Sequence, residues 1–218
     1  MKRVYVSVWT IVVAAGSGAR FGGLKQFEPL GTRRIVDWSV EAADESTDGV
    51  VLVLPPDASG DFAPSASVRT VHGGSSRSAS VRNGLAYVPM SATIIVVHDG
   101  ARPFADAAVF ERVIQAVRAG ADGAIPGVLV TDTIKRVAHD GTIVETVDRR
   151  PLRAVQTPQA FRAEALRTAY SGGSDDTDDA AVVEAAGGRV VVVEGAVENR
   201  KITTPADLVW ARQRAETL

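Results

Sequence analysis

The feature that most constrains the fold is a regular alternation of short β-branched runs with longer amphipathic segments. Several short runs are apolar at consecutive positions, which is typical of parallel strands covered by helices on both faces. The expected strands are Thr10–Ala14, Val50–Leu54, Val68–His72, Thr93–His98, Gly123–Val130 and Arg189–Glu194. The expected helices are Ile35–Asp44, Arg77–Tyr87, Ala107–Ala119, Ala163–Tyr170, Asp178–Ala186 and Pro205–Ala215. This order predicts an α/β fold in which helices sandwich a Rossmann-like, mainly parallel sheet.

Two of the helix starts carry capping signals. Thr204 precedes Pro205, which places a good N-cap residue before a proline at the first helical position. Thr177 is followed by Asp178 and Asp179, and acidic groups stabilise the positive end of a helix dipole. We therefore expect the acidic run from Asp175 to Asp179 to be a surface helix start rather than a metal site.

One segment, residues 131–156, breaks the alternation. It contains two or three short strand patterns with no helix between them, and Asp140-Gly141 is a hairpin signal. We expect a β-arm that projects from the α/β body. Because exposed strand edges need a partner, we also expect the arm to join two copies of the chain in a homodimer. The rest of the sequence shows no domain boundary, so residues 1–218 are expected to form one domain.

Composition and net charge limit the kinds of molecule that the chain is expected to bind. The formal net charge is −2, which gives no reason to expect nucleic acid or a membrane surface as a partner. The chain has no cysteine, which excludes disulfides, thiol nucleophiles and cysteine-ligated metals and suits the cytoplasm. The apolar stretch Val8–Ala15 resembles part of a signal peptide, but it runs into a glycine-rich loop that requires a preceding strand. No apolar run approaches the roughly 20 residues that span a bilayer.

The first constellation with chemical meaning is the loop that follows the first strand, AAGSGARF at 14–21. Its glycines let backbone N–H groups approach a polyphosphate closely, and Arg20 and Lys25 add positive charge. The loop lacks the Gly-Lys-Ser/Thr of a Walker motif and the third glycine of a dinucleotide fingerprint. A plain strand-to-helix turn is the alternative, which the neighbouring basic residues make less favourable.

A second loop, GGSSRSASV at 73–81, follows the strand Val68–His72. Gly73 and Gly74 permit close backbone contact, while the hydroxyls of Ser76, Ser78 and Ser80 can read a base edge or cap a helix. Taken alone, this loop is better interpreted as a capped turn.

The third constellation, HDGARP at 98–103, lies at the end of the strand Thr93–His98. Ligands bind at the carboxyl ends of strands in open α/β sheets. Asp99 can hold Mg²⁺, bond a ribose hydroxyl, or pair with Arg102 to stiffen the turn. His98 is expected to be a core residue or to support a site residue without touching the ligand, since no second histidine lies nearby to form a metal site.

Further polar positions lie in the last half of the chain. Each of them, taken by itself, is better explained as a solvated charge or as a residue that protects an edge strand from pairing. They are Thr133, Lys135, Arg149, the triplet Thr157-Pro158-Gln159 and the run from Asn199 to Thr203. A phosphate loop, several cations, one placed carboxylate and no activated nucleophile fit phosphoryl or nucleotidyl transfer, because that catalysis depends on positioning and charge neutralisation.

Together these motifs resemble the 2-C-methyl-D-erythritol 4-phosphate cytidylyltransferases of the non-mevalonate isoprenoid pathway. The resemblance runs from about Thr10 to Ala211. Besides the three loops, it is carried by LKQF at 24–27, DTIKR at 132–136, TVDR at 146–149, QTPQAF at 156–161, TDDAAVVE at 177–184 and NRKITTPADL at 199–208.

The resemblance implies that a phosphate oxygen of the sugar alcohol attacks the α-phosphorus of CTP in line and releases pyrophosphate, with Mg²⁺ as the metal. It gives Arg20, Lys25, Arg149 and Lys201 catalytic roles. It implies that the nucleotide is bound by Ala14, Ala15, Gly16, Gly18, Gly74, Ser80, Asp99 and Arg102, with Asp99 also the candidate metal ligand. Thr133, Arg149 and Lys201 would bind the sugar-alcohol phosphate, Thr133 and Arg149 acting on the neighbouring subunit's site. Arg150 stands beside Arg149, and either arginine can meet that phosphate.

Three other functions remain open at this point. A ribitol 5-phosphate cytidylyltransferase has similar loops, and the arm motifs favour the methylerythritol enzymes over it. A dinucleotide-dependent oxidoreductase would need the missing third glycine. A non-catalytic nucleotide-binding module would not need all of the basic residues that are present.

Overall fold

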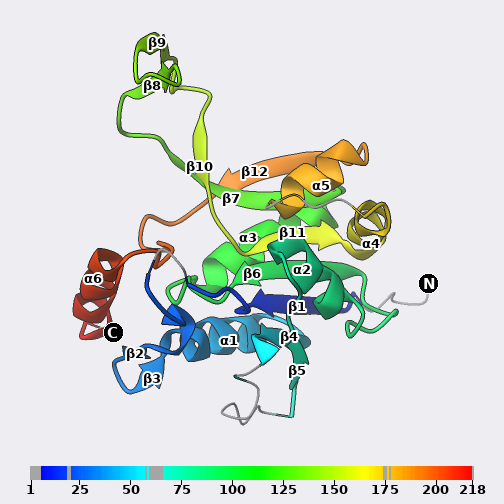
Figure 1. Ribbon diagram of the computed structural model, residues 1–218. Helices are drawn as coiled ribbons and strands as arrows, with labels where there is room; N and C mark the ends of the chain where they lie inside the picture. Colours follow the sequence, from blue (N-terminus) through cyan, green and yellow to red (C-terminus); the bar gives the residue numbers. More distant parts are fainter. Residues whose placement is uncertain are drawn as a thin grey trace.

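The computed structural model describes residues 6–18, 21–56, 58, 66–173, 176 and 178–217. Its main sheet has eight strands (Figure 1). They are β1 (Val8–Val13), β4 (Gly49–Leu54), β5 (Val68–His72), β6 (Ile94–Asp99), β7 (Gly123–Leu129), β10 (Arg153–Val155), β11 (Gln159–Arg162) and β12 (Val190–Glu194). The α-helices are α1 (Ile35–Ser46), α2 (Arg77–Leu85), α3 (Ala107–Arg118), α4 (Ala163–Ser171), α5 (Asp179–Ala185) and α6 (Pro205–Ala215). The predicted mainly parallel α/β sandwich is confirmed.

The sheet is parallel except at two strands. β5, β4, β1 and β6 lie side by side in that order and run parallel. β11 pairs antiparallel with β6 and β7, and β10 pairs antiparallel with the far half of β7. β12 runs parallel to β7 on the other side of that strand. Since β11 runs against its neighbours, its first residues lie at the edge where the parallel strands end.

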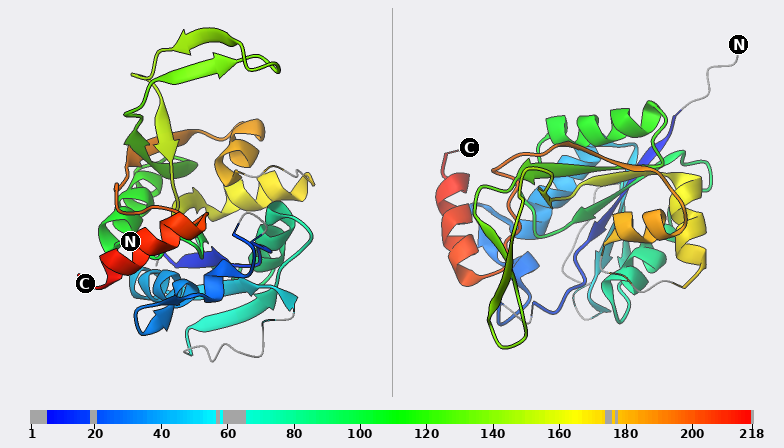
Figure 2. Two further views of the ribbon diagram at one scale, coloured as in Figure 1. Left: turned by 60° about the vertical axis from the view of Figure 1, so that its left-hand side comes forward. Right: turned by 90° about the horizontal axis from the view of Figure 1, so that it is seen from above.

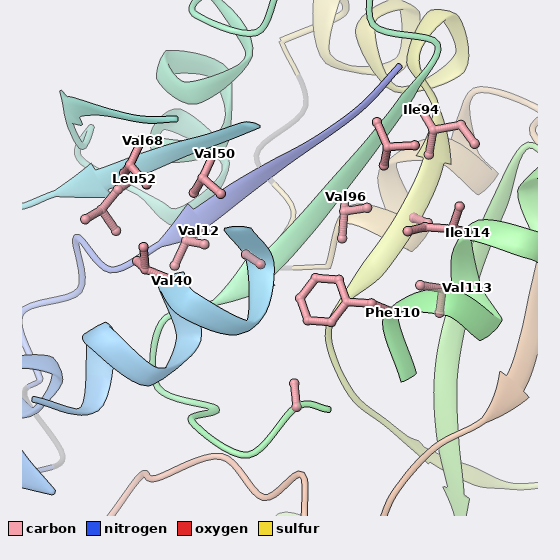
Figure 3. Packing of buried hydrophobic residues seen from close by; sticks show 14 of the residues in the cluster. Val12, Val40, Val50, Leu52, Val68, Ile94, Val96, Phe110, Val113 and Ile114 are labelled. Carbon is pink, nitrogen blue, oxygen red and sulfur yellow. The ribbon is translucent and has the colours of Figure 1, made fainter. Parts of the chain in front are cut away.

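The strands have apolar residues on both faces, and each face packs on its own helices. Val12, Leu52 and Val96 belong to the cluster that α1 and α3 cover, in which Phe110 is fully buried (Figure 3). The alternate strand residues Ile11 and Val53 and their neighbours pack instead on α2, α4 and α5. The period-two alternation of side chains along a strand thus supplies two cores from one set of apolar runs.

A third, smaller cluster joins residues from the segment 21–38 to residues from the segment 202–215. A 3₁₀ turn, η1 (Lys25–Phe27), leads into the short hairpin of β2 (Pro29–Leu30) and β3 (Arg33–Arg34). Leu30 packs with Ile202 and Leu208 in this cluster. Thr204 caps α6 as predicted, because its hydroxyl accepts from the Asp207 N–H at 3.3 Å. The predicted cap at Thr177 lies outside the described residues.

Within the segment predicted as an arm, β8 (Ile134–Val137) and β9 (Ile143–Val147) form a separate two-stranded sheet. This hairpin stands away from the body of the molecule (Figures 1 and 2). Gly141 has φ of +85°, as a turn at Asp140-Gly141 requires. The prediction was too broad at its far end, because β10 pairs with β7 in the main sheet.

None of the described helices combines the length and the apolar run that crossing a bilayer requires.

Candidate active site

A cavity of about 520 Å³ opens where the chain leaves β1, β5 and β6. Its walls are the loop after β1, the 3₁₀ turn η1, the turn before α2, the end of β6 and the segment before α6. This is the edge at which open α/β sheets bind ligands. The predicted residues Ala14, Ala15, Gly16, Gly18, Lys25, Gly74, Ser80, Asp99 and Lys201 all line it.

The shape of the first loop depends on Gly18 and Gln26. Gly18 has φ of +66°, and a Cβ on it would lie 1.7 Å from the Gly23 carbonyl oxygen, so only glycine fits. The buried Gln26 amide donates to the carbonyl oxygens of Ala14 at 2.8 Å and Gly16 at 3.1 Å. The loop is therefore held against η1.

The cation at this loop is Lys25, which begins η1 and lines the cavity. Arg20, the other predicted cation of the loop, lies outside the described residues. The anchoring role of Gln26 was missed at the sequence level, although the motif LKQF contains it.

The second loop lies directly against the first. A Cβ on Gly73 would stand 2.2 Å from the Ala15 Cβ, so the two loops touch here. The Ser80 hydroxyl accepts from the Gly74 N–H at 3.1 Å and donates to the Ser76 carbonyl at 2.9 Å. Ser76 caps α2 by accepting from the N–H of Ala79 at 3.1 Å. The loop thus combines the two alternatives considered for it, a capped turn and a cavity wall.

Asp99 is surrounded by three cations. Its Oδ2 is 2.7 Å from Lys201 Nζ and 3.8 Å from Arg102 Nε, and its Oδ1 is 3.5 Å from Arg77 Nη2. Burial by itself would raise the pKa of Asp99, but Lys201, Arg77 and Arg102 outweigh it and hold that pKa well below its usual range. The carboxylate stays ionised and orients the Lys201 ammonium at the cavity wall.

These contacts also decide whether Asp99 can bind a metal ion. A divalent cation bound to Asp99 would meet positive groups that already occupy both carboxylate oxygens, so Asp99 as it stands does not fit the role of metal ligand. Across the described parts of the chain, no group of three or more acidic or histidine side chains could hold a metal ion.

Arg77 also lines the cavity, although no role was predicted for it. Its Nη2 lies 2.7 Å from Asp179 Oδ2, and the Tyr170 hydroxyl donates to Asp179 Oδ1. Burial opposes the charge of Arg77, but Asp179 and Asp99 raise its pKa above the usual value. The expectation of a surface acidic run is wrong for Asp179, which is fully buried. The pairing was hidden because the two residues are far apart in sequence.

Arg102 is not among the residues that line the cavity. Its Nη1 donates to the Asn199 carbonyl at 2.8 Å. His98 is fully buried, as expected for a core residue.

The two predicted residues of the hairpin segment, Thr133 and Arg149, are exposed and do not line the cavity of their own chain. Arg150 forms a hydrogen-bonded pair with Asp148, whereas Arg149 donates to the carbonyl of Thr131. Arg149 has no carboxylate within ion-pair distance among the described residues, which makes it the better candidate of the two for a phosphate.

Several known proteins share this fold and these motifs. The family model described as 2-C-methyl-D-erythritol 4-phosphate cytidylyltransferase matches residues 8–216. A bifunctional IspD/IspF enzyme of Solidesulfovibrio magneticus is 42% identical over 96% of this chain and 58% of its own length. A second, of a Bradyrhizobium species, is 44% identical over 94% of this chain and 55% of its own length. The chain thus spans about half the length of the curated relatives it matches.

Solved structures agree with the sequence relatives. The 2-C-methyl-D-erythritol 4-phosphate cytidylyltransferase of Thermus thermophilus is 33% identical, with a TM-score of 0.80 over 97% of this chain and 98% of the other. The 4-diphosphocytidyl-2C-methyl-D-erythritol synthase of Anaerococcus prevotii is 27% identical, with a TM-score of 0.83 over 97% and 99%. The chain belongs to the 2-C-methyl-D-erythritol 4-phosphate cytidylyltransferase family, IspD.

Proposed function

We propose that the chain is a cytidylyltransferase that transfers CMP from CTP to 2-C-methyl-D-erythritol 4-phosphate. The products are 4-diphosphocytidyl-2-C-methyl-D-erythritol and pyrophosphate. The observation that carries this proposal is the cavity in which Lys25, Lys201 and a glycine-rich loop meet at the ligand-binding edge of the sheet, in a chain of this family.

In the proposed step, a phosphate oxygen of the sugar alcohol attacks the α-phosphorus of CTP. A new P–O bond forms, the bond to the bridging oxygen of the β-phosphate breaks, and pyrophosphate leaves with that electron pair. A phosphate monoester is largely ionised at neutral pH, so no side chain has to act as a base. The chain's contribution is to orient the reactants and to neutralise the charge that builds on the α-phosphate, through Lys25, Lys201 and Arg20.

Lys201 has to reach the substrate phosphate from its contact with Asp99. The 2.7 Å ion pair holds the ammonium at the cavity wall before the nucleotide arrives. An incoming phosphate oxygen then shares a group that is already oriented, which lowers the reorganisation cost of reaching the transition state.

Mg²⁺ is the ion expected with a triphosphate, since it prefers phosphate and carboxylate oxygens. Because Asp99 does not fit as its ligand, the ion would be held by the oxygens of CTP itself. No step of the proposed reaction is assigned to it.

We also propose a cytoplasmic homodimer assembled through the β8–β9 hairpin. Apolar side chains are exposed on the hairpin, on β7, β10 and β12 and in the turn after β12; they are Leu129, Val137, Ile143, Val144, Val155, Val192 and Val197. Exposed apolar side chains on neighbouring segments favour burial against a second copy. In such a dimer, Thr133 and Arg149 of one subunit would contribute to substrate binding in the cavity of the other.

Pyrophosphate release with CTP and Mg²⁺ tests the function, with 2-C-methyl-D-erythritol 4-phosphate and ribitol 5-phosphate offered in parallel. Release with the first substrate alone is the expected result. Release with ribitol 5-phosphate alone would keep the chemistry and change the substrate, and release with neither would remove the catalytic assignment.

A further inference from the structure

Four residues, three of them buried and Arg102 partly buried, close a ring of hydrogen bonds through their side chains and backbone carbonyls. The Thr157 hydroxyl and His98 Nδ1 are 3.0 Å apart, and His98 Nε2 is 3.3 Å from the Arg102 carbonyl oxygen. Arg102 Nη1 donates to the Asn199 carbonyl at 2.8 Å, and Asn199 Nδ2 donates to the Thr157 carbonyl at 2.8 Å. His98 and Asn199 are fully buried, and none of the four lines the cavity.

The Arg102 carbonyl fixes the direction of this ring, because a carbonyl oxygen can only accept and His98 Nε2 must therefore carry the imidazole hydrogen. His98 Nδ1 then accepts from the Thr157 hydroxyl, whose oxygen accepts from the Asp99 N–H at 2.9 Å. Burial lowers the pKa of His98 to about 4, although Asp99 opposes this, and the ring is therefore neutral at pH 7 with one N–H. Each hydrogen has one acceptor in this arrangement.

The ring joins three segments that are distant in sequence. One is the end of β6 and its following turn, the second is the approach to β11, and the third is the segment before α6. Asp99 follows His98 directly, and Lys201 lies two residues beyond Asn199. A backbone bond from the Ile202 N–H to the Ala101 carbonyl, 2.9 Å long, adds a further tie between the first and third segments.

We propose that His98 and Thr157 are positioning residues, which set the place of Asp99 and Lys201 without touching either substrate. The inference rests on the proposed function. A lysine on a long flexible side chain is useful to an in-line reaction only when its backbone and its counter-ion are fixed. The Thr157 hydroxyl holds the Asp99 backbone directly, and the ring holds the chain that carries Lys201 to the same carboxylate.

The variant Thr157→Val tests the inference, because it keeps the branched shape and removes only the hydroxyl. We expect kcat to fall by about 10- to 100-fold, as for a small misplacement of a reacting group. The KM for CTP should change less, because the loops after β1 and β5, which hold most of the predicted nucleotide-binding residues, are untouched. Thr157→Ser restores the hydroxyl and should recover most of the activity.

A second comparison separates positioning from general structural damage. In a Lys201→Ala background, Thr157→Val should cost little more, because the group that it positions is already absent. Equal losses of kcat in both backgrounds would overturn the inference, as would an unchanged kcat in the single variant.

A measurement on the wild-type protein covers the case in which Thr157→Val does not fold. The ¹⁵N chemical shifts of the His98 imidazole at pH 7 should show a hydrogen on Nε2 and none on Nδ1. A hydrogen on Nδ1 would overturn the ring and with it the inference. This readout needs no activity, so an inactive wild-type protein with the expected tautomer would count against the proposed function alone.

Discussion

At the residue scale, the charges around the cavity are arranged as opposite pairs rather than as a positive patch. Asp99 lies between Lys201 and Arg77, and Asp179 holds Arg77 from the other side. Buried charges are costly unless they are paired and hydrogen-bonded. The alternation therefore allows several cations to stand at the wall of a small cavity before any anionic substrate binds.

We expect Lys25 to contribute to the rate of CMP transfer and not to the free energy of unfolding. Lys25→Ala removes a cation from the wall at which the triphosphate is proposed to lie, so kcat is expected to fall by about 100- to 1,000-fold, as after loss of an oxyanion donor. Steady-state pyrophosphate release measures the rate, and thermal unfolding measures the stability. Arg118→Ala is the matched control, because Arg118 is exposed at the end of α3. Similar rates for the two variants would contradict the assignment.

His98 should govern part of the pH dependence of stability. Its pKa is about 4 in the folded chain and is ordinarily 6.5, so the unfolded chain takes up the proton first. The stabilisation is complete above pH 6.5 and is lost as the pH falls from there towards 4. The loss amounts to about 3 kcal/mol in the free energy of unfolding.

Urea unfolding between pH 7.5 and 4.5 measures this effect. His98→Phe should flatten the dependence, whereas His139→Phe, on the exposed hairpin turn, should leave it as in the wild type. If the free energy of unfolding of His98→Phe still falls with pH as in the wild type, groups other than His98 cause the effect.

At the scale of elements, the sequence predicted those whose signals are local. Apolar runs identified six strands of the main sheet, and amphipathic segments identified the six helices, with ends that differ from the structure by at most three residues. β11 was missed as a strand because its polar end residues, Gln159 and Arg162, leave only a very short apolar pattern between them. Its burial comes from pairing with two neighbouring strands, which the local sequence does not show. The short strand β10 was assigned to the arm because its partner, β7, is more than 20 residues away.

The cavity was predictable to a similar degree. Glycine-rich loops and polar residues at strand ends can be recognised in a sequence from residue type and position. These two signals identified Gly18, Lys25 and Asp99. Gln26, Asp179 and Asn199 act through contacts that only the folded chain creates, so the motifs that contain these residues did not indicate their partners.

The hairpin of β8 and β9 should be separable from the body of the protein. Its strands pair only with each other in the described sheets, so replacing residues 134–147 by a short Gly-Ser linker should leave cooperative unfolding intact. Because the exposed apolar residues Val137, Ile143 and Val144 go with it, the variant should be monomeric.

Analytical ultracentrifugation measures this change of mass. Met90→Lys is a suitable control, because it changes an apolar side chain that is 81% exposed elsewhere on the surface. A shortened chain that still sediments as a dimer would place the subunit interface elsewhere.

At the scale of the whole molecule, the small third cluster connects the two segments that carry the lysines of the cavity. Phe21 and Leu30, on either side of η1 with Lys25, pack in one cluster with Ile202, which follows Lys201. A nucleotide that contacts both should stabilise the folded chain as a unit.

CTP should therefore raise the midpoint of thermal unfolding, and NAD should not. At a concentration 100 times its dissociation constant, a ligand that binds only the folded state adds about 2.7 kcal/mol to the free energy of unfolding. Differential scanning fluorimetry with CTP, ATP and NAD in parallel measures the shifts. A larger shift with NAD would favour the dinucleotide alternative.

The reversed direction of β11 has a consequence for how such a protein can evolve. Because this strand begins at the edge where the cavity opens, the chain that returns from the hairpin passes through β10 and then reaches β11 beside Asp99, through Thr157. In the proposed homodimer, mutations that adjust how two copies meet would then act on a segment that is hydrogen-bonded to Asp99. Selection on association and selection on turnover would fall on the same few residues, so neither property could change without affecting the other.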